Sequence, residues 1–200
     1  MSDNPTFQAY DRYADVYDQE VVDFWEQFPT EFIQAFQEQA PGNRVLNLGS
    51  GSGRDAVLLR QLGFEVTCVD ASAAMVDMTR MLGFTSVQAD FRTLDFTPES
   101  FDGIWAYTSL IHIPKSEAEE VLRSVRGLIP AGGVLALGVI QGDHDGMVTR
   151  DSMPDEARYF KFYTADELRG MAESAGYEFV YAKDYQPRNS VYLNHLYVKP

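Results

Sequence analysis

The fold is decided by the stretch Arg44-Val-Leu-Asn-Leu-Gly-Ser-Gly-Ser-Gly-Arg54. Its first five residues are mostly apolar, which predicts a buried strand, and the residues after Arg54 follow a helical pattern as far as Leu62. Glycines at alternate positions join the two elements. Glycine lets the backbone turn tightly and approach a ligand closely, and a helix N-terminus offers free N–H groups and positive potential. The segment therefore predicts either a ligand-binding loop or a tight turn between strand and helix.

Short apolar runs and helical patterns alternate on the C-terminal side of this loop. Strands are predicted over residues 65–70, 86–89, 101–107 and 133–140. Ser72 is the expected N-cap of a helix that reaches Leu82, and Ser116 with Glu119 has the spacing of a capping box for a helix ending near Gly127. Such alternation predicts a doubly wound parallel sheet with helices on both faces.

The two ends of the chain have other patterns. Aromatic residues recur every fourth position between residues 24 and 36, which predicts an N-terminal helical region, and Pro29 marks a break or a helix start within it. Near the C-terminus, Thr164 with Glu167 predicts a capped helix that ends at Gly176. Strands over 177–184 and 190–198 follow, and their short connection requires an antiparallel hairpin.

Composition restricts the partners and the compartment. The chain has 30 acidic and 16 basic residues and a net charge of −14. Such a surface repels phosphate backbones and anionic membranes, so we expect neither a nucleic-acid nor a membrane partner. The start Met1–Pro5 has no basic or apolar stretch, so no signal peptide is expected. A single cysteine, Cys68, in an apolar run indicates a reducing compartment, and we expect a cytoplasmic protein.

Two acidic positions follow the next strands in a nucleotide-binding order. Asp70 ends the second strand, where a carboxylate can accept hydrogen bonds from both hydroxyls of a ribose, or alternatively stabilise the next helix N-terminus. Asp90 and Phe91 follow the third strand. Asp90 could accept a hydrogen bond from an adenine amino group and Phe91 could lie against the adenine ring. Alternatively, Asp90 is a loop acid and Phe91 a core residue. The glycine spacing G-x-G-x-G argues against the dinucleotide fingerprint G-x-G-x-x-G.

In this order and spacing, the chain from about Tyr10 to Pro200 resembles the class I S-adenosylmethionine-dependent methyltransferases, in particular their small-molecule branch. The resemblance rests on residues 10–17, on the glycine loop, on Val69-Asp70 and Ala89-Asp90, on Phe101–Trp105 with Ser109–Pro114, on Leu128–Gly133 and on Phe162–Thr164. It implies a Rossmann-like α/β fold with a seven-stranded, mostly parallel sheet whose last strand is antiparallel.

The resemblance also implies the cofactor and one domain. S-adenosylmethionine would be the methyl donor and S-adenosylhomocysteine the product, with a small-molecule acceptor. The regions are an N-terminal helical cap (1–40), a donor-binding core (44–140), a candidate lid (141–163) and a helix with the terminal hairpin (164–200). The implied donor-binding residues are Tyr17, Asn47, Gly49, Ser50, Gly51, Gly53, Arg54, Asp70, Ala71, Asp90, Phe91 and Tyr107.

The chain departs from the family pattern at Asn47, where an acid is usual. That acid helps to arrange the methionine end of the donor, and asparagine can accept a hydrogen bond but brings no charge. Arg54 could bind the donor carboxylate bidentately, or be an exposed arginine at a helix start.

Methyl transfer from a sulfonium needs alignment of acceptor, methyl and sulfur, and a base only if the acceptor must lose a proton. His112 is the candidate base, because imidazole titrates near neutrality and its loop would face the donor; the alternative is a packing or hydrogen-bonding histidine. Arg158 and Tyr159, in the candidate lid, could contact substrate, or the segment is a surface connection. Consecutive loop residues Asp143–Asp145 make a poor metal cage, so no metal is expected.

Two other functions compete with this reading. A nicotinamide-dependent oxidoreductase could use a related sheet, although the glycine spacing and the terminal hairpin speak against it. A non-catalytic S-adenosylmethionine-binding module is compatible with Asn47 and with the lack of a recognisable acceptor motif. The acceptor, its target atom and the oligomeric state are not specified by these residues.

Overall fold

The computed structural model describes residues 4–200 and contains a seven-stranded sheet in the order β3-β2-β1-β4-β5-β9-β8. Neighbours from β3 to β5 are parallel, whereas β9 is antiparallel to both β5 and β8. The strands are β1 (Arg44–Leu48), β2 (Glu65–Asp70), β3 (Thr85–Gln88), β4 (Gly103–Tyr107), β5 (Val134–Ile140), β8 (Glu178–Ala182) and β9 (Tyr192–Val198). Residues 1–3, and with them most of the start on which the signal-peptide expectation rests, lie outside the described range.

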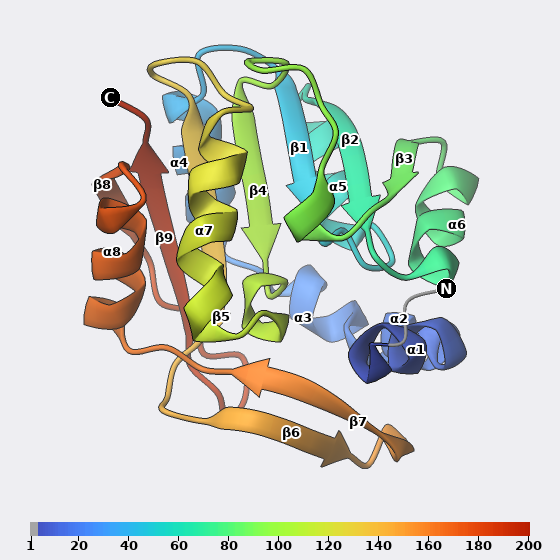
Figure 1. The fold of residues 1–200 in the computed structure, drawn as a ribbon. Coiled ribbons are helices and arrows are strands. Elements are labelled where there is room, and N and C mark those ends of the chain that lie inside the picture. The colour runs from blue at the N-terminus through green and yellow to red at the C-terminus, as the bar shows by residue number, and fades with distance from the viewer. Residues whose placement is uncertain (1–3) are drawn as a thin grey trace.

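Helices cover both faces of the sheet, with α7 and α8 on one side and α4 and α5 on the other (Figure 1). Each face buries its own apolar cluster, because fully buried parallel strands present apolar side chains in both directions. The helices of the layers are α4 (Thr30–Gln39), α5 (Arg54–Gln61), α6 (Ala73–Met81), α7 (Lys115–Arg126) and α8 (Ala165–Ser174).

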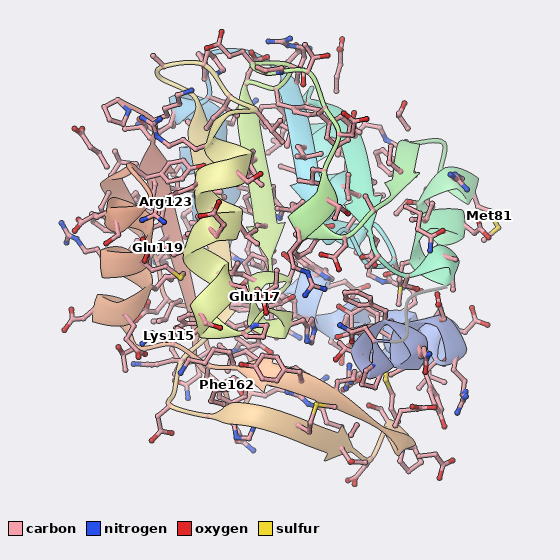
Figure 2. All side chains as sticks on the ribbon, viewed as in Figure 1. Met81, Lys115, Glu117, Glu119, Arg123 and Phe162 are labelled. Carbon is pink, nitrogen blue, oxygen red and sulfur yellow. The ribbon has the colours of Figure 1, made fainter. Side chains whose placement is uncertain are left out.

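The outward face of α7 carries charged side chains, as an amphipathic helix requires (Figure 2). Arg123 pairs with Glu119 one turn away, and Glu117 pairs with Arg92 at 3.0 Å. The opposite face packs Val121 and Leu122 into the core. This division fixes α7 against the sheet.

A separate layer lies across the carboxyl ends of the parallel strands (Figure 1). It consists of the N-terminal helices and of an antiparallel hairpin inserted after β5: α1 (Pro5–Arg12), α2 (Ala14–Glu20), α3 (Val22–Glu26), β6 (Asp145–Arg150) and β7 (Met153–Lys161). α1 packs directly on β7, so segments 140 residues apart in sequence meet over the ligand-binding edge of the sheet.

The predicted fold class is confirmed, including the antiparallel end. Ser72 caps α6, Thr164 and Glu167 form the predicted capping box, and Pro29 precedes α4 as its N-cap residue. The capping box at Ser116 and Glu119 is wrong. The carbonyl of Pro114 already accepts the first helical bonds, so Ser116 lies within the first turn and cannot cap it.

The β6–β7 hairpin was not predicted as strands. Gly146 and Pro154 interrupt the pattern, and the bulge between Thr149 and Arg150 breaks the regular alternation. Among residues 4–200, no helix combines the length and apolar character needed to cross a membrane.

Candidate active site

The glycine loop turns directly above the end of β1. Gly49 has φ +76°, in the left-handed region, and its N–H donates to the carbonyl of Val69 at 2.8 Å. A Cβ added to Gly49 would lie 2.2 Å from Cβ of Ser109 and 2.8 Å from Cζ of Phe91. This position therefore needs glycine for both its conformation and the close approach of the loop after β4.

Asp70 ends β2 beside this loop. Its carboxylate accepts hydrogen bonds from the N–H groups of Gly51 and Ser72, both at 2.9 Å, with one on each oxygen. A carboxylate has about four acceptor sites, so both oxygens can still accept from a ligand. Burial raises the pKa of Asp70 to about 6, against the effect of these two hydrogen bonds.

A narrow cavity of about 60 Å³ lies over the loop and under α1. It brings together most of the predicted donor-binding residues and His112: Tyr17, Gly49, Gly51, Asp70, Ala71, Asp90, Phe91, Tyr107 and His112. One water-sized site takes roughly 10–15 Å³, so this space holds only a few waters while α1 lies across it.

Other predicted donor-binding residues do not line this cavity. Ser50 and Gly53 belong to the loop but face away from it, and Asn47 is fully buried beneath. The Asn47 amide donates to Oδ1 of Asp55 at 2.8 Å, and Trp105 Nε1 donates to Oδ2 at 3.1 Å. Burial raises the pKa of Asp55 to about 7. The chain thus holds a carboxyl group in the first turn of the helix after the loop, next to the position where the family usually has an acid.

Arg54 is not brought to the cavity. Its guanidinium makes a bidentate ion pair with Asp18 of α2, at 2.8 and 2.6 Å.

Asp90 does line the cavity, and it is held by Arg92 through both carboxylate oxygens. Burial would raise the pKa of Asp90, but the hydrogen bonds from Arg92 outweigh it and lower the pKa. Asp90 is therefore ionised and available to a neighbouring amino group.

His112 connects the two segments that cover the cavity. Its Nδ1 lies 2.7 Å from the carbonyl oxygen of Tyr159, and its Nε2 lies 2.8 Å from the hydroxyl of Tyr10. A carbonyl can only accept, so Nδ1 carries the proton and Nε2 accepts from Tyr10. Burial lowers the pKa of His112 to about 4, which keeps the ring neutral. Both ring nitrogens are thus occupied within the protein.

A second cavity, of about 310 Å³, adjoins the first. Tyr10, Tyr17 and Thr108 line both. The walls of the second cavity are largely aromatic and basic, and include Phe24, Trp25, Arg150, Arg158, Phe160 and Tyr192. Arg158 therefore lies at a ligand-sized space, as the sequence predicted. Tyr159 lines neither cavity and contributes its backbone to His112 and to Thr6.

Sequence reasoning missed Thr108, Phe24 and Trp25. Thr108 has φ +50°, a strained conformation for a β-branched residue, at the point where the two cavities meet. Phe24 was assigned to the four-residue aromatic repeat of a helix face. The local pattern has no separate signal for this role, because Phe24 and Trp25 both pack against the same apolar cluster and both line the cavity.

The described residues include no group of three or more metal-ligating side chains. The site is instead a glycine loop, a carboxylate at the second strand end and two joined cavities at the carboxyl edge of a parallel sheet.

The sequence profile described as "Methyltransferase domain" matches residues 19–182. The chain belongs to this methyltransferase family. The predicted resemblance is thereby confirmed, and the family decides against the nicotinamide oxidoreductase alternative.

Curated relatives of this methyltransferase match about half of the chain. Ubiquinone biosynthesis O-methyltransferase of Xanthomonas campestris pv. campestris (strain B100) is 32% identical over 107 residues, which are 50% of this chain and 44% of that protein. The chain spans about half the length of the curated relatives it matches.

Solved structures share the fold at low identity. DhpI in complex with S-adenosylhomocysteine has a TM-score of 0.77 at 22% identity, covering 98% of this chain and 96% of that one. The Burkholderia thailandensis 1,6-didemethyltoxoflavin-N1-methyltransferase, with that compound and S-adenosylhomocysteine bound, has a TM-score of 0.71 at 20% identity, covering 96% and 87%. At these identities the likeness concerns the fold.

Proposed function

We propose that this methyltransferase transfers a methyl group from S-adenosylmethionine to a small-molecule acceptor. The observation that carries the proposal is the junction of the two cavities at Tyr10, Tyr17 and Thr108, with the glycine loop and Asp70 lining the first. The hydroxyl of Ser109 is buried without a hydrogen-bond partner, and Ser109 lines the first cavity, so this hydroxyl is available to a polar group of a nucleoside ligand. The Burkholderia methyltransferase of the same fold binds S-adenosylhomocysteine together with a small molecule, which supports this arrangement.

The chain supplies binding and alignment. When bound, the sulfonium donor supplies an activated methyl group and a neutral leaving thioether. Asp70 would accept hydrogen bonds from the ribose hydroxyls, and Asp90 would accept one from the adenine amino group. The N–H groups of the glycine loop would hold the rest of the donor. Tyr10 and Tyr17, in edge contact at 5.2 Å, form a wall between donor and acceptor spaces and exclude water from their junction. Proximity and orientation supply the acceleration.

His112 acts in this proposal as a positioning residue and not as a base. It links α1 to β7 through Tyr10 and Tyr159, and its depressed pKa makes it a weak proton acceptor. His112→Ala is expected to accelerate dissociation of S-adenosylhomocysteine about thirtyfold, because the two lost hydrogen bonds contribute ~1 kcal/mol each to closure. Stopped-flow measurement of the dissociation rate tests this.

His144→Ala is the matched control, because His144 contacts Phe162 and not α1. Its dissociation rate should equal that of the unaltered protein. An unchanged rate for His112→Ala would contradict the positioning role and favour proton abstraction by this residue.

The cover over the site consists of α1–α3 from the predicted cap and of the predicted lid 141–163, in one domain with the core, whereas α4 of the predicted cap packs on a face of the sheet. The hydroxyl of Tyr10 on α1 donates to Nε2 of His112, and the backbone N–H of Tyr159 on β7 donates to Oγ1 of Thr6 on α1 at 2.9 Å. Cap and lid therefore close as a unit. The small volume of the first cavity supports a cover that opens for the donor. Limited proteolysis within β6–β7 should slow when S-adenosylhomocysteine is bound; equal rates would contradict the lid.

The proposal is tested by thermal unfolding with S-adenosylmethionine, S-adenosylhomocysteine and NAD in parallel. A ligand at 100 times its dissociation constant stabilises by about 2.7 kcal/mol, which corresponds to several degrees. Stabilisation by the two adenosyl compounds alone is expected. Stabilisation by none of them would refute the donor assignment, and donor binding without methyl transfer to any of a broad acceptor panel would favour a non-catalytic module.

The acceptor is proposed to carry neither a nucleic-acid backbone nor a membrane anchor, since the net charge of −14 repels both. The buried single thiol of Cys68 supports a cytoplasmic location. Filter binding to RNA and DNA, and fractionation of cells, check these two points; retention of nucleic acid or secretion would overturn them.

A further inference from the structure

The second cavity contains a buried positive charge without a counter-ion. Arg158 on β7 is 2% exposed, and its Nε has no hydrogen-bond partner. Among the ion pairs of residues 4–200, none includes Arg158. Its guanidinium instead lies against two rings, 5.0 Å from the centroid of Tyr10 and 5.2 Å from that of Phe160. The guanidinium also hydrogen-bonds with the Tyr10 hydroxyl, but a neutral hydroxyl does not balance its charge. Burying a charge without a counter-ion destabilises a protein, so this arrangement indicates a ligand that supplies one.

A second guanidinium lies at the same cavity. Arg150 on β6 and Arg158 on β7 both line the second cavity. The guanidinium of Arg150 is 4.7 Å from the centroid of Phe160, and no ion pair of the described residues includes it. Two positive charges therefore share one aromatic ring.

Counter-ions are plentiful elsewhere in this acidic chain. With 30 acidic and 16 basic residues, most arginines have a carboxylate partner: Arg12, Arg44, Arg54, Arg80, Arg92, Arg123, Arg169 and Arg188. The acids that line the second cavity, Glu20 and Asp23, are exposed at its rim, and Asp23 is paired with Arg188 at 3.5 Å. The interior of the cavity thus remains positive.

The remaining walls suit a planar apolar body. Phe24, Trp25 and Tyr192 line the cavity together with Phe160, and Phe24 is in edge contact with Tyr192 at 4.9 Å. Aromatic walls favour offset or edge contacts with another ring. The volume of about 310 Å³ corresponds to roughly ten waters at their volume in the liquid, enough for a single substituted ring.

We propose that the second cavity binds the methyl acceptor through a carboxylate, held by Arg158 with Arg150 beside it, and that the acceptor is an aromatic carboxylate. A guanidinium binds a carboxylate bidentately and stacks on aromatic faces, which is the chemistry these two arginines present. The inference rests on the proposed function, because it takes the second cavity as the acceptor site.

The carboxylate of the methionine part of the donor could supply the same charge. The two sources are separable because 5′-methylthioadenosine has the nucleoside of S-adenosylhomocysteine without its amino-acid carboxylate. If Arg158 serves the acceptor, Arg158→Met leaves the affinities for both nucleosides unchanged. A loss of S-adenosylhomocysteine affinity of tenfold or more, with unchanged 5′-methylthioadenosine affinity, would assign Arg158 to the donor and overturn the proposal.

The direct test compares benzoate and 4-hydroxybenzoate with benzamide, the neutral analogue of similar shape. Binding is measured by calorimetry and by the fluorescence of Trp25, with Trp25→Phe identifying that signal, on the free protein and on the protein saturated with S-adenosylhomocysteine. The carboxylates are expected to bind at least about tenfold more tightly than benzamide, the gain of one charge-assisted pair. Arg158→Met should abolish this preference.

Arg188→Met is the matched control, since Arg188 lines the same cavity at its rim and already has a partner. It should keep the preference for carboxylates. Because Arg158→Met removes an unpaired buried charge, its unfolding temperature should be no lower than that of the unaltered protein, which excludes loss of the fold as the cause.

Equal binding of benzoate and benzamide, no binding of either carboxylate at millimolar concentration, or a preference that survives Arg158→Met would each overturn the carboxylate assignment. Failure of the proposed function has a different signature, namely no binding of S-adenosylhomocysteine, and the measurements on the free protein remain interpretable in that case.

Discussion

Gly49→Ala is expected to weaken binding of S-adenosylhomocysteine about 100-fold or more, equivalent to ~2.8 kcal/mol. The residue has φ +76°, and a side chain there meets Cβ of Ser109 at 2.2 Å and the ring of Phe91 at 2.8 Å. Neither contact is with the flexible end of a long side chain, so the loop itself must move. That movement displaces the N–H groups of the loop and the adjoining wall of the donor cavity. Calorimetric titration with S-adenosylhomocysteine measures the loss.

Gly63→Ala separates the clash from the backbone strain. Gly63 has φ +92° and no atom within 4 Å of an added Cβ, and it follows α5 away from both cavities. This control should lose about 1–2 kcal/mol of unfolding free energy to strain and retain its affinity for S-adenosylhomocysteine. Equal affinities of the two variants would show that the packing of Gly49 against Ser109 does not shape the donor site.

Asp70→Ala is expected to weaken S-adenosylhomocysteine binding by roughly 100-fold. Two hydrogen bonds from ribose hydroxyls to a carboxylate contribute ~1.5 kcal/mol or more each. The variant also frees the N–H groups of Gly51 and Ser72, which Asp70 holds at 2.9 Å, so part of the loss comes from the loop. Asp77→Ala, on the exposed side of α6, is the matched control and should bind normally.

The same carboxylate should make binding pH-dependent. Burial raises the pKa of Asp70 to about 6, so a growing share of the group is protonated as the pH falls below that value. A protonated carboxyl has lost acceptor capacity, and affinity should therefore fall with decreasing pH, roughly tenfold between pH 8 and pH 5. Asp70→Asn should bind weakly and without this pH dependence. A flat profile in the unaltered protein would contradict the ribose contact.

The sequence alone predicted the strands of the sheet and most of the residues that line the first cavity. The loop from Gly49 to Gly53, the strand that ends at Asp70 and the capped helix at Thr164 depend on residues close together in the chain, where spacing reports the backbone directly. The antiparallel end could be predicted because residues 183–191 are too few for a parallel crossover. The local signal failed at Ser116, where Pro114 starts the helix earlier.

The partners of the polar side chains were decided only by the tertiary structure. Arg54 is the first residue of α5 whether its side chain faces a ligand or pairs with Asp18, and only the packing of α2 against the loop selects the pairing with Asp18. His112, Tyr10 and Tyr159 come from three segments far apart in sequence, and Arg158 lacks a counter-ion only because of what the fold places around it. Local sequence specifies backbone conformation through short-range sterics and hydrogen bonds, whereas the charge and contacts of a site depend on which distant segments pack together.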